Sequence, residues 1–173
     1  MIVHGSCHCG AITFEAEIHP EEVFLTHSAD GRALSGAAFG VLVPCRRNAF
    51  YPISGTPRFY IKQGEGGRRR AIAFCGNCGS PIHSTDADDR EADFILPTGI
   101  LAEVALLPPR RQIWTDNALP WLSQIPAFPA APAAEKARLP CAVAVAVAVA
   151  VAVIRVRSAS SDRCSRDCRS ARP

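Results

Sequence analysis

Two pairs of closely spaced cysteines are the residues of this chain best suited to chemistry. The first pair lies in the sequence Cys-His-Cys-Gly at 7–10, and the second lies in Cys-Gly-Asn-Cys-Gly at 75–79. Two thiolates on one tight turn leave two positions of a tetrahedral ion open, and a second turn from a distant part of the chain can fill them. A glycine follows each pair, and glycine reaches the positive φ of such turns without a Cβ penalty. The spacing predicts one zinc ion held by Cys7, Cys9, Cys75 and Cys78.

The alternatives to a zinc site are buried thiols without a metal and a redox dithiol. A redox Cys-x2-Cys pair usually stands at the start of a helix that follows a strand, and the Gly-Ser-Pro-Ile sequence at 79–82 does not predict a helix start. The N-terminal residues do not resemble a secretory signal, so we expect a cytoplasmic protein with reduced thiols. A zinc ion with four protein ligands has no open position for water or substrate, and its predicted role is therefore structural.

Short stretches of alternating apolar and polar residues predict the elements that would position the cysteines. Apolar residues occupy every second position between 12 and 16, as in a half-buried strand. Residues 28–38 include several small residues and could form a short helical turn, although two glycines oppose it. Further strands, separated by turn sequences at 54–57 and 64–67, are predicted at 39–43, 58–62, 70–74 and 94–96. The domain is predicted to be mainly β.

Length and composition limit the chain to one domain with a tail. Its 173 residues include 48% hydrophobic and 20% charged residues, which is enough apolar material for a core. The formal net charge is +3, but residues 155–173 hold six Arg and two Asp, a local balance of +4, so the first 154 residues carry −1. Since the basic charge belongs to the tail, we expect no specific binding of nucleic acid by the domain.

The sequence predicts a domain at 1–128 and a tail at 129–173. The tail begins as a Pro/Ala-rich linker, continues after Cys141 as an Ala-Val repeat, and ends in an Arg- and Ser-rich stretch that is typical of disorder. The repeat is shorter than the roughly 20 residues of a membrane-spanning helix, so no membrane association is expected. Cys141, Cys164 and Cys168 are interpreted as free thiols. The alternative for the tail is an anchor that contacts phosphates through its arginines.

Three segments give the domain a resemblance to a known family. They are Gly-Ser-Cys-His-Cys-Gly-Ala-Ile at 5–12, Phe-Cys-Gly-Asn-Cys-Gly-Ser-Pro at 74–81 and the closing segment from Trp114 to Trp121. In this order they resemble the glutathione-dependent formaldehyde-activating enzyme family, which also includes centromere protein V. The resemblance implies a fold of stacked β-sheets with a structural zinc ion on the two cysteine pairs. It also implies carbon-sulfur lyase chemistry, in which formaldehyde and glutathione are joined as S-hydroxymethylglutathione.

One feature of that family is missing from the chain. The resemblance implies a second, catalytic zinc ion on a Cys-x-Cys-x2-Cys motif between the two pairs, followed by Arg. Thr26, Ser28 and Gly31 stand at the matching positions, before Arg32. Hydroxyl groups do not ionise like thiols near neutral pH and are poor zinc ligands, and glycine has no side chain to offer. We therefore expect one structural zinc ion, no second ion, no catalytic residues and an impaired lyase.

His27, Asp30 and Cys45 are the substitute ligands that could restore a second metal and an active lyase. Each has a simpler interpretation: His27 as a surface or hydrogen-bonded histidine, Asp30 as part of a turn, and Cys45 as a lone thiol. His8, inside the first pair, is expected to point to solvent, and His83 is a weaker candidate still.

Glutathione or another small thiol is the expected small-molecule partner. The glycine-rich turn and arginines at 64–70 could bind the carboxylates of glutathione, but a hairpin turn with solvated basic flanks is the favoured interpretation. Trp114 and Trp121 could line a pocket or belong to the core. Three hypotheses follow: a family member with impaired activity, an active lyase with substitute ligands, and a non-catalytic protein-binding module.

Overall fold

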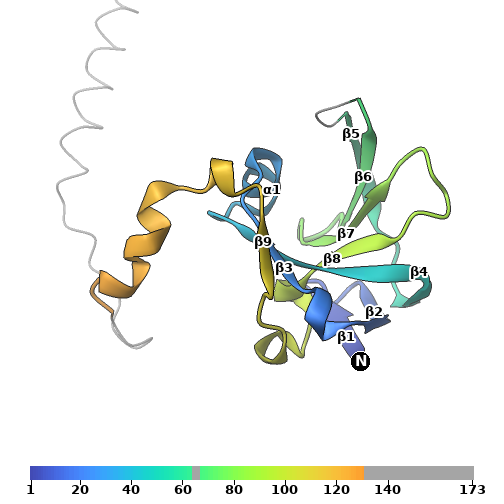
Figure 1. Ribbon diagram of the computed structural model, residues 1–173. Helices are drawn as coiled ribbons and strands as arrows, with labels where there is room; N and C mark the ends of the chain where they lie inside the picture. The colour runs from blue at the N-terminus through green and yellow to red at the C-terminus, as the bar shows by residue number, and fades with distance from the viewer. Residues whose placement is uncertain (64–66, 131–173) are drawn as a thin grey trace, which may run out of the picture. The chain divides into compact units, whose positions relative to one another are not determined.

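The structure, a computed structural model, describes residues 1–63 and 67–130 (Figure 1). Its strands are β1 (Ile2–Ser6), β2 (Thr13–Ile18), β3 (Phe24–Thr26), β4 (Gly40–Ser54), β5 (Arg58–Gln63), β6 (Arg69–Phe74), β7 (Pro81–Asp86), β8 (Phe94–Pro97) and β9 (Arg111–Ile113). The helices are α1 (Ala29–Ser35) and the short 3-10 helices η1 (Pro20–Glu22), η2 (Thr98–Ile100), η3 (Val104–Leu106), η4 (Thr115–Asn117) and η5 (Pro120–Ala127). The prediction of a mainly β fold is confirmed.

Hydrogen bonds join the nine strands of the described residues into one sheet (Figure 1). The order along the main path is β1-β2-β4-β8-β7-β6-β5, and all of its pairs are antiparallel. Strand β3 pairs with β4, and β9 lies parallel to β3. The first part of the 15-residue β4 pairs with β3 and β8 and its later part pairs with β2. Strand β4 therefore joins β1 and β2 to the other strands of the sheet.

The core is formed by strands from both ends of that order. Buried residues alternate with exposed or half-buried ones along β1 and β2, as a sheet with one face in the core requires. The ring centroids of Phe14 and Phe50 lie 4.7 Å apart, and those of Phe50 and Phe94 lie 5.1 Å apart. The same core cluster contains Val3, Phe14, Val43, Ala73, Ile82 and Leu96. Because strands β1 and β6 contribute to one core, the turns that follow them can meet.

The alternating pattern located five of these strands and missed four. The predicted segments correspond to β2, β4, β5, β6 and β8, and the predicted helical turn corresponds to α1. Strands β3 and β9 have only three residues each, too few for a pattern. Strand β7 buries the polar residues His83 and Thr85 on its core side, so its sequence does not alternate between apolar and polar residues.

Contacts group Met1–Pro126 into one compact unit. Among the residues described, no helix has the length and apolar character that a bilayer crossing needs. The predictions about residues 64–66 and about the tail from 131 onward, including the Ala-Val repeat and Cys141, Cys164 and Cys168, lie outside the described residues. The domain limit at residue 128 stays a prediction.

Candidate metal centre and ligand pocket

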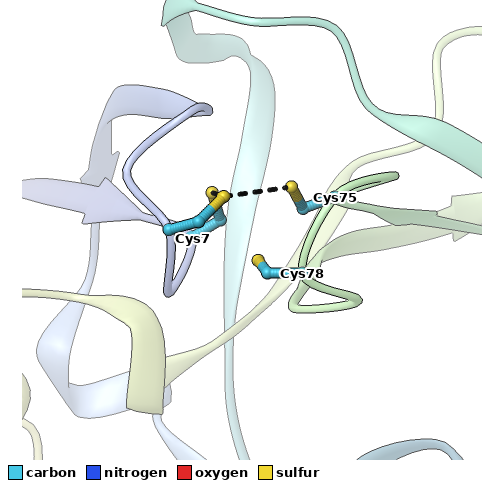
Figure 2. A group of neighbouring side chains, drawn as sticks. Cys7, Cys75 and Cys78 are labelled. Carbon is cyan, nitrogen blue, oxygen red and sulfur yellow. Dashed lines mark hydrogen bonds between the residues drawn. The ribbon is translucent and has the colours of Figure 1, made fainter.

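The four cysteines predicted to bind zinc meet at one point. Cys7 and Cys9 lie on the turn between β1 and β2, and Cys75 and Cys78 lie on the turn between β6 and β7 (Figure 2). All four Sγ atoms lie within 4.8 Å of one another. The distance is 3.6 Å between the first two sulfurs and 3.8 Å between Cys9 and Cys75. A Zn–S bond of about 2.3 Å gives about 3.8 Å between sulfurs in a tetrahedron, so both the donors and their spacing fit zinc.

A glycine closes each cysteine turn in the predicted conformation. Gly10 has φ of 75° and Gly79 has φ of 77°. Their N–H groups donate to the carbonyl oxygens of Cys7 and Cys75, both at 2.9 Å. Each turn therefore folds back on its first cysteine and directs two sulfurs to the same side. The prediction of positive φ at these two glycines is confirmed.

Polar groups lie beside the two more exposed sulfurs of the cluster, and those beside Cys78 favour its thiolate form. Asn77 Nδ2 donates to Cys9 Sγ at 3.3 Å, and Ser80 Oγ lies 3.3 Å from Cys78 Sγ. Hydrogen bonds from the side chain and backbone of Ser80 lower the pKa of Cys78 to about 5. The chain continues from Ser80 into strand β7 rather than into a helix, which disfavours the redox-dithiol alternative.

The proposed substitute ligands do not come together. His27 Nε2 lies 2.8 Å from Gln112 Oε1, and the Asp30 carboxylate forms an ion pair with Lys62 from the first turn of α1, not from a turn as expected. Cys45 is buried in the core, and burial raises the pKa of its thiol to about 11. Within residues 1–63 and 67–130, the four-cysteine cluster is the only group of three or more Cys, His, Asp or Glu side chains placed to share an ion.

His8 and His83, the other two histidines considered as ligands, have different environments. His8 is exposed, as predicted. The His83 ring is buried with its centroid 4.1 Å from that of Phe94 and 5.5 Å from that of Phe50. Burial, and to a lesser degree the charge of Arg47, lowers the pKa of His83 to about 4, so this histidine is neutral at pH 7. Its burial was missed because no apolar pattern marks β7.

A pocket of about 810 Å³ opens on the face of the sheet opposite the core. Ser84 and Ile95 are partners across β7 and β8 and line the pocket. Their neighbours His83 and Phe94 have rings in contact on the core side. Since consecutive residues of a strand point to opposite faces, most of the pocket lies on the face away from the core, and His83 contributes to both.

Thr26, Ser28 and Gly31, the three positions at which the resemblance implies thiolates, line this pocket together. The Gly31 N–H donates to Ser28 Oγ at 3.1 Å, which also caps α1. A Cβ atom placed on Gly31 would lie 2.7 Å from Ser28 Oγ and 3.6 Å from Thr26 Cγ2. The three positions therefore converge as metal ligands would, but they offer two hydroxyl groups and a glycine.

The closing segment of the domain forms another wall of the pocket. Arg32 of α1 donates to the carbonyl oxygens of His27 and of Asn117, the latter at 2.8 Å, and so fixes the helix against η4. Trp114 lines the pocket, has φ of 58°, and is 53% exposed. Trp121 is 43% exposed. The interpretation of the two tryptophans as core residues is therefore wrong.

Fold and centre together define a class of protein: a mainly β domain with a cluster of four cysteines that could hold a metal ion. The chain belongs to the glutathione-dependent formaldehyde-activating enzyme family, whose model matches residues 2–117. Among solved structures, the chain is similar to a Rhodobacter sphaeroides protein, with 20% identity over 65% of this chain and 99% of that one and a TM-score of 0.49. No curated protein matches the chain.

Proposed function

We propose that this chain is a zinc-stabilised member of the family that lacks lyase activity toward formaldehyde and glutathione. Cys7, Cys9, Cys75 and Cys78 would hold the ion, and the fit of four sulfurs within 4.8 Å of one another supports this part of the proposal. A zinc ion with four protein ligands cross-links the chain and offers no position for a substrate. The role of this centre is therefore structural.

The loss of activity is inferred from Thr26, Ser28 and Gly31. Their convergence at the pocket is the observation that supports the proposal, because three ligands of one ion at these positions would have to lie close together. Neutral hydroxyls are poor zinc ligands, and Ser28 Oγ already accepts the N–H of Gly31. The described residues of the pocket can bind and orient a ligand through Lys62 and Arg70, but they hold no thiolate.

Restoring the thiols tests this proposal. We expect the triple variant Thr26→Cys/Ser28→Cys/Gly31→Cys to bind a second zinc ion per chain and to consume formaldehyde in a glutathione-dependent reaction. The matched control is Thr26→Ser/Gly31→Ser, which places a hydroxyl group at each of the three positions and should gain neither property. A wild-type chain that already consumes formaldehyde as fast as the triple variant would contradict the proposal.

The remaining expectations about partners belong to this proposal as well. A pocket of about 810 Å³ has room for glutathione or another small thiol. A cytoplasmic location, where thiols stay reduced and available to a metal ion, is part of the proposal. Binding of another protein by a non-catalytic domain stays a prediction that no described contact tests.

A further inference from the structure

One end of the pocket carries two positive side chains, and one of them, Arg70, forms no ion pair among the described residues although Asp86 stands opposite it across β6 and β7. Lys62 and Arg70 are partners across β5 and β6, so their side chains lie on the same face of the sheet, and both line the pocket. Lys62 is paired with Asp30 of α1. Arg70 has no carboxylate partner within 4.0 Å among residues 1–63 and 67–130, and its Nη2 donates to Ser84 Oγ at 3.0 Å. A neutral hydroxyl therefore orients the guanidinium without neutralising it.

The rest of the pocket wall is apolar. The apolar side chains on this face of the sheet are Ile72 of β6, Ile95 and Pro97 of β8, and Leu42 of β4. Leu34 of α1 and Trp114 after β9 add two large side chains that are 46% and 53% exposed. Large apolar side chains left exposed around a hollow of this volume are typical of a ligand site.

The charged side chains lie at one end of the pocket, and the apolar wall extends from there to the other end. Strands β5 and β6, with Lys62 and Arg70, stand at one end of the strand order, whereas β9 and Trp114 lie beyond β3 at the other. A ligand that matches both ends has one anionic group and an apolar body. Glutathione has two carboxylates, an ammonium group and two peptide groups, and an apolar wall would leave several of these without partners.

We propose that the pocket binds small carboxylic acids with an apolar body in preference to glutathione. The carboxylate pairs with Arg70, and the body lies along the sheet toward Trp114. The Asp30 carboxylate competes with the ligand for Lys62, since both are anions beside the same ammonium group. This inference goes beyond the proposed function, because it rests on the pocket wall and is independent of the metal content.

Fluorescence of Trp114 provides the test. The chain has two tryptophans, so Trp121→Phe leaves Trp114 as the only reporter. In this background of the full chain we titrate decanoate, its uncharged analogue decanol, and glutathione. We expect saturable quenching or a wavelength shift with decanoate, at an affinity about tenfold or more above those of decanol and glutathione, as one charge-assisted hydrogen bond provides.

Three variants locate the charge effect. Arg70→Ala should weaken decanoate about tenfold and leave decanol unchanged, and Asp30→Asn should strengthen decanoate several-fold because a competing anion is removed. Arg68→Ala is the matched control, since Arg68 is an exposed arginine of the same hairpin that does not line the pocket; it should bind decanoate like the parent. Equal affinities for decanoate and decanol, tighter binding of glutathione, or an unchanged affinity in Arg70→Ala would each overturn the proposal.

The zinc content and lyase assay of the same proteins report on the proposed function separately. Neither Arg70 nor Asp30 contacts the cysteine cluster, so one zinc ion per chain is expected in every variant. If the Trp121→Phe parent chain holds one zinc ion but does not bind decanoate, this inference alone is refuted. Two zinc ions with lyase turnover would refute the proposed function alone.

Discussion

The four clustered cysteines differ in exposure although they meet at one point. Cys7 and Cys75 are buried, Cys78 is half-buried and Cys9 is exposed. This difference separates metal binding from packing, because a change at the exposed cysteine removes a sulfur without opening a cavity in the core. Cys45 is buried in the core but is not one of the four clustered cysteines, so a change there alters packing and leaves the four sulfurs in place.

We therefore expect Cys9→Ser to lose zinc and to unfold at a lower temperature, since a bound structural zinc contributes on the order of 10 kcal/mol of apparent binding free energy. Cys45→Ser should keep one zinc ion per chain and lose only about 1 to 2 kcal/mol from the changed packing. Zinc analysis together with thermal unfolding distinguishes the two variants. Full zinc retention by Cys9→Ser would show that this sulfur is not a ligand.

The turn between β4 and β5 depends on a glycine that no other residue can replace without strain. Gly55 has φ of 72°, and a Cβ atom there would lie 2.2 Å from the carbonyl oxygen of Ala11. Gly55→Ala should lower the free energy of unfolding by at least about 2 kcal/mol. Gly99→Ala is the control, because a Cβ atom at Gly99 meets nothing within 4 Å. Equal urea midpoints for the two variants would contradict this account of the turn.

Strand β7 makes the stability of the domain depend on pH through His83. The pKa of this histidine is about 4 in the folded chain, below its usual value of 6.5, so the unfolded chain takes up a proton first as the pH falls. The free energy of unfolding should therefore decrease by about 2 kcal/mol from this group between pH 7 and pH 5. The loss is complete only below pH 4.

His83→Phe should remove that decrease and keep the aromatic contacts of the core. The exposed His8 provides the control, since His8→Gln should leave the pH dependence as in the wild type. Urea unfolding of all three chains at pH 7 and pH 5 measures the difference. A pH dependence in His83→Phe as steep as in the wild type would assign it to other groups.

Much of the metal centre could be predicted from the sequence, whereas the pocket could not. Cysteine spacing and the following glycines are local signals, and they identify the four sulfurs before any strand is placed. The pocket uses alternate residues of many strands, of which β3 and β9 are three residues long and β7 carries polar residues on its core side. Arg70 accordingly resembled a solvated basic flank, although it lines the pocket.

The cysteine turns connect distant parts of the whole sheet. The first turn follows β1, which is at one end of the main strand order, and the second follows β6, which is next to the strand at the other end. An ion shared by these turns would cross-link the β1–β2 and β6–β7 hairpins, which lie far apart in the sequence, around the common core. The positions of the second donor set lie apart from this centre, on the pocket face, and contain no thiol.

Zinc content of the purified full chain tests this account most directly. Elemental analysis should find one zinc ion per chain, which Cys9→Ser loses and Cys45→Ser keeps. A chain without zinc that is fully folded would refute the structural centre. Two zinc ions per chain would show that the pocket assembles a second metal site despite Thr26, Ser28 and Gly31.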